Sequence, residues 1–188
     1  MLYLIHRIVN KIIYYINLLY SYWYGAVISN EGNLSVTYPL YINNVRSVSF
    51  GKNCCVGRYS RIECFGSPTI NPKVRIGNNV NINWNVHIGA LKSITIEDNV
   101  LIGSHVMIID HNHGSTTDIV LPPEKRELIS SGDIYIESNV WIGEGCMILP
   151  NVRIGKNSII GAGSIITKNI PSNSVVVGNP GRVIKSIR

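Results

Sequence analysis

The sequence predicts an all-β fold built from a stacked repeat and preceded by one amphipathic helix. A branched aliphatic residue recurs every six positions through residues 136–170, where the isoleucines are Ile136, Ile142, Ile148, Ile154, Ile160 and Ile166. Self-similarity at a short fixed period is typical of stacked-repeat architectures. Six residues do not fit a heptad and are too few for a helical repeat, but they fit a short strand and a corner. The pattern therefore predicts coils in which one branched side chain per face points inward.

A second column of small or β-branched residues follows the isoleucines at the fourth position, and it includes Cys54 and Cys146. The four cysteines form no CxxC pair and show no zinc-finger spacing, so we expect reduced, structural thiols. A glycine stands directly after three of the isoleucines, at Gly143, Gly155 and Gly161. We expect these glycines to supply corners with positive φ.

The six-residue interval also organises the chain into segments. With 188 residues, there is room for one domain with a sizeable core. The segments that we predict are an N-terminal helix at 1–24, a lead-in at 25–49, the repeat at 50–170 and a basic tail at 171–188. An insertion at residues 110–133 interrupts the repeat and must protrude from it. Long loops inside compact repeats are typically functional.

The N-terminal helix is expected at residues 1–24 because its polar positions recur at helical spacing. These positions are His6, Arg7, Asn10, Lys11, Asn17 and Ser21. The uncharged run after Lys11 is shorter than the roughly 20 residues that span a bilayer, and no secretory cleavage site follows. Two interpretations stay open: the helix caps the open end of the repeat, or it lies at a membrane interface.

Four stretches of the chain resemble the hexapeptide-repeat acetyltransferases, in particular the galactoside and maltose acetyltransferases and the O-acetyltransferases of surface-polysaccharide pathways. The stretches are NINWN (81–85), IIDHNHG (108–114), NVWIGEGCMILPNVRIG (139–155) and IIGAGSIITKNIPSNSVVVGNPGRVIKSIR (159–188). The resemblance covers residues 45–188. It implies a left-handed parallel β-helix of triangular section, and a homotrimer with active sites between neighbouring β-helices.

The resemblance implies acetyl transfer from acetyl-CoA to a hydroxyl, with His111 as the general base. An imidazole titrates near neutrality and can take a proton from a hydroxyl. Because a thioester is already activated, no serine or cysteine nucleophile is required. His113 is the alternative base, since an alignment without gaps from the preceding repeat reaches it instead. Asp110 is expected either to orient the imidazole or to begin an Asx turn.

The acceptor pocket is expected to combine asparagine, tryptophan and loop residues. Asn83 matches a family asparagine beside the catalytic histidine, where an amide can donate and accept hydrogen bonds, so we count it as catalytic. Trp141 matches a tryptophan that walls the family's pocket. We assign Asn85, His113 and Asp110 to the same pocket, although Asn85 fits a plain corner residue better.

The C-terminal coils match the family's binding site for acetyl-CoA, the cosubstrate that we expect. Its adenine, pantetheine and phosphate groups require a long groove, backbone N–H groups and a few cations. The matching residues are Gly143, Ala162, Thr167, Lys168, Arg182 and Lys185. A backbone N–H near Gly143 is expected to stabilise the oxyanion of the reaction.

Charge and histidine spacing limit the other ligands. The net charge of +6 comes with no nucleic-acid motif, so we expect small anionic ligands or an acidic membrane surface and no nucleic acid. The presence of several histidines on a hexapeptide-repeat scaffold resembles the γ-class carbonic anhydrases, which bind zinc through three histidines. His105, His111 and His113 do not reproduce that spacing, so we expect no metal.

The acceptor that we expect is a sugar hydroxyl of a surface polysaccharide or of its lipid-linked precursor. The expected location is the cytoplasm, and the N-terminal helix also allows the inner face of the membrane. Two alternative activities are N-acetylation of an amino sugar and acetylation of an antibiotic. An alternative of another class is a catalytically inactive scaffold with the same repeat.

Overall fold

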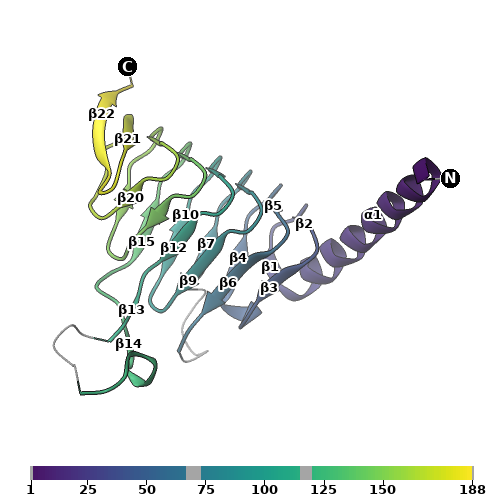
Figure 1. The fold of residues 1–188 in the computed structure, drawn as a ribbon, viewed down its shortest axis with the longest axis horizontal. Helices are drawn as coiled ribbons and strands as arrows, with labels where there is room; N and C mark the ends of the chain where they lie inside the picture. The colour runs from purple at the N-terminus through teal and green to yellow at the C-terminus, as the bar shows by residue number, and fades with distance from the viewer. Residues whose placement is uncertain (1, 67–72, 115–119, 188) are drawn as a thin grey trace.

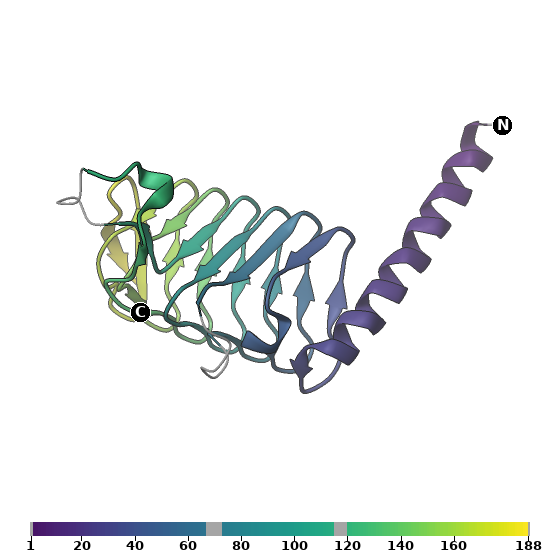
Figure 2. The ribbon, with the colours of Figure 1, turned by 90° about the horizontal axis from the view of Figure 1, so that it is seen from below.

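The computed structural model describes residues 2–66, 73–114 and 120–187, and it shows one long helix followed by a parallel β-helix (Figure 1). Successive short strands join three parallel sheets in rotation, which we name A, B and C. Each turn of the chain therefore adds one strand to each sheet, and the turns stack along a single axis (Figure 2). This arrangement fits the left-handed β-helix that the sequence predicts.

The strands are short, and most contain two or three residues. Sheet A contains β1 (Ser29–Asn30), β4 (Val48–Phe50), β7 (Val74–Ile76), β10 (Ile94–Ile96), β15 (Ile134–Ile136) and β18 (Arg153–Ile154). Sheet B contains β2 (Ser35–Val36), β5 (Cys55–Val56), β8 (Asn81–Ile82), β11 (Leu101–Ile102), β16 (Trp141–Ile142), β19 (Ile159–Ile160), β21 (Ser174–Val177) and β22 (Arg182–Ser186). Sheet C contains β3 (Leu40–Ile42), β6 (Ser60–Cys64), β9 (His87–Ala90), β12 (Met107–Ile109), β17 (Met147–Ile148) and β20 (Ile165–Ile166).

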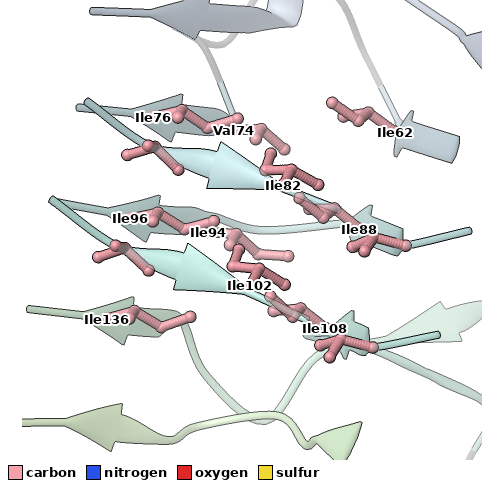
Figure 3. Packing of buried hydrophobic residues seen from close by; sticks show 14 of the residues in the cluster. Ile62, Val74, Ile76, Ile82, Ile88, Ile94, Ile96, Ile102, Ile108 and Ile136 are labelled. Atoms are coloured by element: carbon pink, nitrogen blue, oxygen red, sulfur yellow. The ribbon is translucent and has the colours of Figure 1, made fainter. Parts of the chain in front are cut away.

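The core is the column of branched side chains enclosed by the three sheets. Ile76, Ile96 and Ile136 pair in register on sheet A and lie one above another in Figure 3. All three are at most 3% exposed, as the six-residue period predicts. Burial of each such side chain contributes roughly 1.5–3 kcal/mol. Cys54 and Cys146 are buried and unpaired, and burial raises the pKa of both thiols, in agreement with the predicted structural role.

The corners between sheets A and B depend on asparagines with left-handed backbone. Asn53, Asn79 and Asn99 have φ of 58°, 55° and 59°, a region that asparagine tolerates better than most residues. Their amides form a ladder, because Asn53 Nδ2 donates to Asn79 Oδ1 (3.2 Å) and Asn79 Nδ2 donates to Asn99 Oδ1 (3.0 Å). Each corner therefore binds the next coil through its side chain as well as through its backbone.

The glycines after the isoleucines have another role than the predicted one. Gly143, Gly155 and Gly161 do not adopt positive φ, so that expectation is wrong. A Cβ on Gly143 would lie 2.6 Å from Ala162 N, and one on Gly155 would lie 2.4 Å from Ser172 N. Glycine is needed at Gly143 and Gly155 because the backbone of the next coil occupies the space of a side chain, and at Gly161 the Val177 side chain occupies it.

The N-terminal helix α1 (Leu2–Val27) covers the open end of the first coil with its last turns only. Tyr24 is buried and its hydroxyl donates to Leu40 O (2.9 Å), and Asn17 Oδ1 accepts from Tyr38 N (2.9 Å). The earlier turns extend away from the β-helix (Figure 2). Two features differ from the prediction. The helix continues to Val27. The segment at 25–49, predicted as a lead-in, already forms a coil of the β-helix.

The sequence analysis missed that first coil, although Val36 on β2 and Ile42 on β3 already keep the six-residue interval. Val36 and Leu40 are its buried residues on sheets B and C. A short 3₁₀ helix, η1 (Val45–Ser47), leads from this coil to β4. The tail at 171–188 also belongs to the fold, since β21 pairs parallel with β19 and β22 returns antiparallel to β21.

The insertion leaves the repeat after β12 and protrudes as predicted (Figure 1). It contains an antiparallel hairpin of β13 (Asn112–His113) and β14 (Leu128–Ile129), with the 3₁₀ helix η2 (Pro123–Lys125) before β14. Residues 115–119 of the insertion lie outside the described residues. The chain rejoins sheet A at β15.

A substitution tests the close contact between coils. A Cβ on Gly103 would lie 2.7 Å from Glu144 N, so Gly103→Ala should lower the free energy of unfolding by about 1–3 kcal/mol. Gly25, in α1, has nothing within 4 Å of an added Cβ, so Gly25→Ala should raise stability by up to about 1 kcal/mol. Urea denaturation measures both. Wild-type stability of the Gly103 variant would contradict this explanation.

Candidate active site

Asp110, the first residue of the insertion, is a fully buried carboxylate. Its Oδ1 accepts from Leu91 N (2.7 Å), and its Oδ2 accepts from Lys92 N (2.7 Å) and Ser93 N (2.8 Å). Burial raises the pKa of Asp110, but hydrogen bonds from His111 and from these three N–H groups outweigh it, so the pKa lies below its ordinary value. The bonds reach back to the preceding corner, so the carboxylate anchors the start of the insertion.

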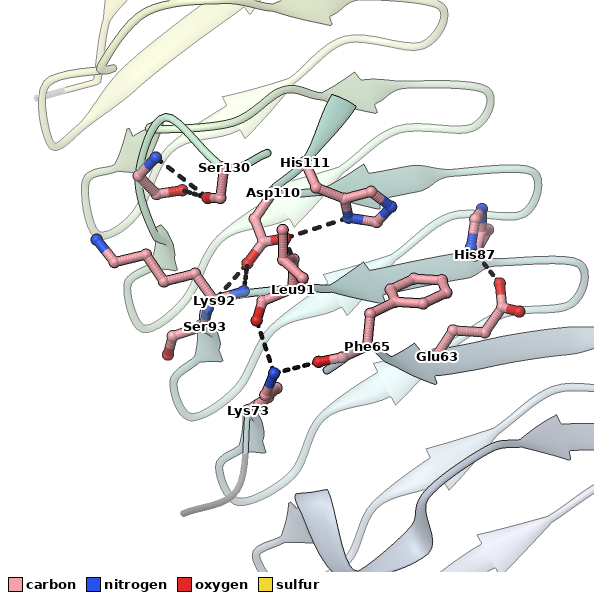
Figure 4. A network of polar contacts seen from close by, with 11 residues as sticks. Glu63, Phe65, Lys73, His87, Leu91, Lys92, Ser93, Asp110, His111 and Ser130 are labelled. Atoms are coloured by element: carbon pink, nitrogen blue, oxygen red, sulfur yellow. Dashed lines mark hydrogen bonds and ion pairs between the residues drawn. The ribbon is translucent and has the colours of Figure 1, made fainter. Parts of the chain in front are cut away.

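His111 is held in one orientation by that carboxylate. Its Nδ1 lies 3.2 Å from Asp110 Oδ1 (Figure 4). An ionised carboxylate can only accept, so Nδ1 carries a proton, and in the neutral imidazole the lone pair is on Nε2. The imidazole is 7% exposed and packs edge-on against Phe65, with ring centroids 4.8 Å apart. Of the two expected roles of Asp110, the structure shows the contact that would orient the imidazole.

His113, the alternative base, occupies a different environment. It lies on β13, pairs with Leu128 in the hairpin and is exposed to solvent. The buried carboxylate of Asp110 contacts His111, its direct neighbour, and therefore distinguishes the two histidines.

A second polar cluster on sheet C adjoins His111. Arg61 and Glu63 lie on β6 and His87 lies on β9, where His87 Nε2 is 2.9 Å from Glu63 Oε2 (Figure 4). His87 Nδ1 is 3.1 Å from Arg61 Nη2. Burial and the Arg61 charge lower the pKa of His87, against the opposing effect of Glu63. His87 is therefore neutral near neutral pH.

Sequence reasoning missed this cluster. The alternation of Arg61, Ile62 and Glu63 does predict two outward side chains on one strand. Only the parallel register, which pairs Arg61 with His87, brings the histidine to them. It also missed Lys73, which is 3% exposed and donates from Nζ to Phe65 O and to Leu91 O; no motif marks this residue.

Several of the predicted acceptor and cofactor residues line a groove on the outer face of sheet B. Asn83, Trp141, Gly143 and Ala162 border a hollow of about 480 Å³ together with Ser104. Trp141 points outward from β16, as expected, and is 51% exposed. The groove has the mixed apolar and polar lining that small-molecule sites require.

The predicted cofactor residues divide between two places. Lys185, on β22, borders a neighbouring hollow of about 730 Å³ that shares Ile159 with the first, and Arg182 lies on the same strand. Thr167 and Lys168 follow β20, at the corner after sheet C. Sheet B therefore brings four of the six predicted residues to one face, and the other two lie at a different corner.

The backbone N–H of Gly143 is not free for catalysis. It donates to Ile160 O at 2.7 Å in the contact between coils. The expected oxyanion donor near Gly143 would therefore have to be a neighbouring amide, because the stacking of the coils consumes this one.

Asn85 is a corner residue, which the sequence analysis considered the better fit. Its φ of 57° is left-handed, and its Nδ2 lies 2.7 Å from His105 Nδ1 of the next coil. The ring of Trp84 packs edge-on against His105 at 4.6 Å between centroids. The structure therefore engages Asn85 in coil stacking and does not bring it into the groove beside Trp141.

The groove and His111 do not meet within one chain. Asn83 lies at the corner that precedes sheet C, whereas His111 follows sheet C at its far edge. A strand of four residues such as β9 spans roughly 13 Å at 3.3 Å per residue, and this length separates the two positions.

Among the residues that the structure describes, no group of three or more His, Cys, Asp or Glu side chains is arranged to hold a metal ion.

Comparisons with known proteins agree with this architecture. Residues 133–168 match the family model "Bacterial transferase hexapeptide (six repeats)". A protein of Escherichia coli strain K12, provisionally named a lipopolysaccharide biosynthesis O-acetyl transferase (WbbJ), is 38% identical over 156 residues, which are 80% of this chain and 77% of that protein. The galactoside O-acetyltransferase of the same strain is 43% identical over 119 residues, 61% of this chain and 54% of that enzyme. The chain thus spans about half the length of its galactoside relative.

Solved structures show the same fold. A galactoside acetyltransferase in complex with coenzyme A has a TM-score of 0.61 and 32% identity, over 85% of this chain and 65% of that one. AntD, an N-acyltransferase from Bacillus cereus, has a TM-score of 0.73 over 87% of each chain, but its 22% identity shows the fold alone. Since WbbJ is matched over most of both chains, the protein belongs to the hexapeptide-repeat transferase family, as the resemblance of its motifs predicts.

Proposed function

We propose that this protein is an acetyl-CoA-dependent O-acetyltransferase that acts on a sugar hydroxyl of a surface polysaccharide or of its lipid-linked precursor. The observation that carries the proposal is the pair of Asp110 and His111, in which a buried carboxylate contacts Nδ1 of the imidazole and so favours the neutral tautomer with its lone pair on Nε2. The relatives support the reaction class, because WbbJ and the galactoside enzymes are named as O-acetyltransferases and one is solved with coenzyme A.

In the proposed transfer, one proton passes through His111. His111 Nε2 takes the proton of the acceptor hydroxyl as its oxygen attacks the thioester carbonyl. Asp110 accepts from Nδ1–H and stabilises the imidazolium that forms. When the bond between the carbonyl carbon and sulfur breaks, the proton on Nε2 passes to the thiolate of CoA. The imidazole is then ready for another cycle.

The groove on sheet B is where we place the cosubstrate. Asn83 borders it beside β8, Trp141 borders it next to Ile159, and Ala162 leaves room for a narrow chain to approach the backbone. Lys185 and Arg182 lie beyond Ile159 and supply cations for the phosphate groups. Thr167 and Lys168 would complete the phosphate site only from a different corner of the coil.

A homotrimer reconciles these positions. One chain holds its candidate base at the far edge of sheet C and its groove on sheet B, so neither surface forms a complete site alone. Packing of neighbouring β-helices would place His111 of one chain against the groove of the next. We therefore propose a homotrimer with active sites between its subunits.

Contact with a membrane surface is the role that we propose for the projecting part of α1. None of the described helices is both long and apolar enough to cross a bilayer. The projecting turns nevertheless expose an apolar stripe at helical spacing, formed by Ile5, Ile8, Val9, Ile12, Ile13 and Ile16. Arg7 and Lys11 add the cations that favour an anionic interface, which would keep the enzyme near a lipid-linked acceptor.

The proposed activity is tested by CoA release. The protein, incubated with acetyl-CoA and a panel of p-nitrophenyl glycosides, should release thiol only with acceptors that carry free hydroxyls, and the product should be an ester by mass spectrometry. Preference for amino-sugar acceptors would identify an N-acetyltransferase. Absence of CoA binding in calorimetry would remove the enzyme proposal and leave the scaffold alternative.

The general base is tested by paired substitutions. His111→Ala should lower kcat by roughly 10²–10⁴, the range for loss of an acid–base group, with CoA affinity unchanged. His113→Ala, in the exposed hairpin, is the matched control and should keep most of the activity. The opposite result, measured by thiol release, would transfer the role of base to His113.

Deletion of residues 1–16 tests the membrane contact and keeps the turns that bind the first coil. The shortened protein should lose partition onto anionic vesicles, and the loss should be largest at low salt because salt screens the contribution of Arg7 and Lys11. Co-sedimentation with phosphatidylglycerol vesicles measures the partition. The activity of the shortened protein on a soluble acceptor is the control. Should the full-length protein stay in the supernatant, α1 serves only as a cap.

A further inference from the structure

The outer face of sheet C beside His111 carries a polar and aromatic surface that the reaction proposed above does not use. We call it the sheet C cluster, and it consists of Arg61, Glu63, Phe65 and His87. Figure 4 shows Glu63, Phe65 and His87 on the same side of the sheet as the His111 ring. Arg61, Glu63 and His87 hold each other through polar contacts, and Phe65 packs against His111, so the surface is ordered before any ligand arrives.

The hydrogen bonds of the cluster determine its protons. Arg61 can only donate, so His87 Nδ1 accepts from Arg61 Nη2 (3.1 Å) and the His87 proton lies on Nε2. That proton is donated to Glu63 Oε2 (2.9 Å), and Arg61 Nε forms an ion pair with the same oxygen (2.9 Å). Within the described part of the chain, the hydrogen bond and the ion pair of the Glu63 carboxylate thus reach the same oxygen. Glu63 Oε1 is left to accept from a ligand.

A comparable ion pair on sheet A shows that this arrangement is not required by the fold. Glu137 pairs with Arg153, and the glutamate side chains of both pairs are 18% exposed. Glu137 uses both oxygens within the chain, because Oε1 accepts from Arg153 Nε (2.7 Å) and Oε2 accepts from Lys156 N (2.8 Å). Glu63 differs from Glu137 in the oxygen that it leaves open.

The strand partner of Glu63 lies against both imidazoles. Gly89 pairs with Glu63 in the sheet, and a Cβ on Gly89 would lie 3.1 Å from His111 Cε1 and 3.3 Å from His87 Nε2. The absence of a side chain on Gly89 therefore lets both imidazoles lie close to the strand. Phe65, against His111, supplies an apolar ring edge of the kind that packs against the C–H groups of a sugar.

We infer that the sheet C cluster is the acceptor subsite, and that Glu63 Oε1 accepts a hydrogen bond from a second hydroxyl of the sugar whose neighbouring hydroxyl meets His111. The inference rests on the proposed function, with His111 as base. It names the substrate class as a sugar with two adjacent free hydroxyls. Arg61 and His87 are positioning residues, because they act by holding the carboxylate.

Such a site should discriminate strongly against acceptors that lack the second hydroxyl. When a deoxy analogue binds, the Glu63 carboxylate loses its hydrogen-bond donor. The free-energy cost of removing water from the carboxylate is then not compensated. Discrimination by Glu63 should therefore appear in the acceptor KM, while the KM for acetyl-CoA, which binds on sheet B, stays unchanged.

The experiment uses the full-length protein, the best p-nitrophenyl glycoside from the panel, and its monodeoxy analogues at the positions next to the acetylated one. Glu63→Gln keeps the size of the side chain but replaces one acceptor oxygen with a donor. It should raise the acceptor KM at least about tenfold and remove most of the preference over one deoxy analogue. Arg61→Lys should cause a smaller rise. Glu137→Gln is the matched control and should leave both KM values as in the wild type.

Three results would overturn the inference. An unchanged acceptor KM in the Glu63 variant would exclude the subsite while the acetyltransferase activity stands. A change in oligomeric state by light scattering, with the KM values of both substrates raised together, would make the pair a subunit contact instead. If the wild type binds CoA but acetylates no glycoside, the proposed function fails and the subsite with it.

Discussion

The close stacking of one coil on the next is the constraint on which the rest of this structure depends. Each strand donates and accepts hydrogen bonds with the coils above and below, and this leaves no room for a side chain directly after several strands. A Cβ on Gly103 or Gly143 would meet backbone atoms of the next coil within 2.7 Å. Asparagines complete the corners because they accept left-handed φ and bind each other along the stack. Isoleucine then fills the interior at the inward positions, of which the sheet A strands β10 and β15 have two each.

The same stacking explains where chemistry is possible. Inward side chains are committed to the core and corner amides to the ladder, so outward residues and insertions remain available for ligands. The insertion begins where Asp110 takes up three backbone N–H groups of residues 91–93. That carboxylate stabilises the exit of the chain from the repeat and orients His111 as well. Structural and proposed catalytic roles therefore meet in one buried side chain.

The two ends of the stack expose edges that must be protected from pairing with other chains. At the C-terminal end, β22 folds back antiparallel on β21. At the N-terminal end, the last turns of α1 cover the first coil through Tyr24 and Ser21. Capping requires only those turns, and the remaining ones present an apolar stripe to solvent. The length of the helix beyond the cap is thus the feature that the proposed membrane contact explains.

The sequence by itself determined the repeat, its inward isoleucines, the protruding insertion, the N-terminal helix and the family, because all of these depend on local spacing. It was wrong about the glycines, since close contact between coils leaves no periodic signal, and about the lead-in, although Val36 and Ile42 there already keep the six-residue interval. Asp110 and His111 could be selected as candidates from their motif, but the hydrogen bonds to residues 91–93 could not. Only the tertiary structure decided that Arg61, Glu63 and His87 come together, because parallel register joins residues 24 or 26 positions apart in the chain.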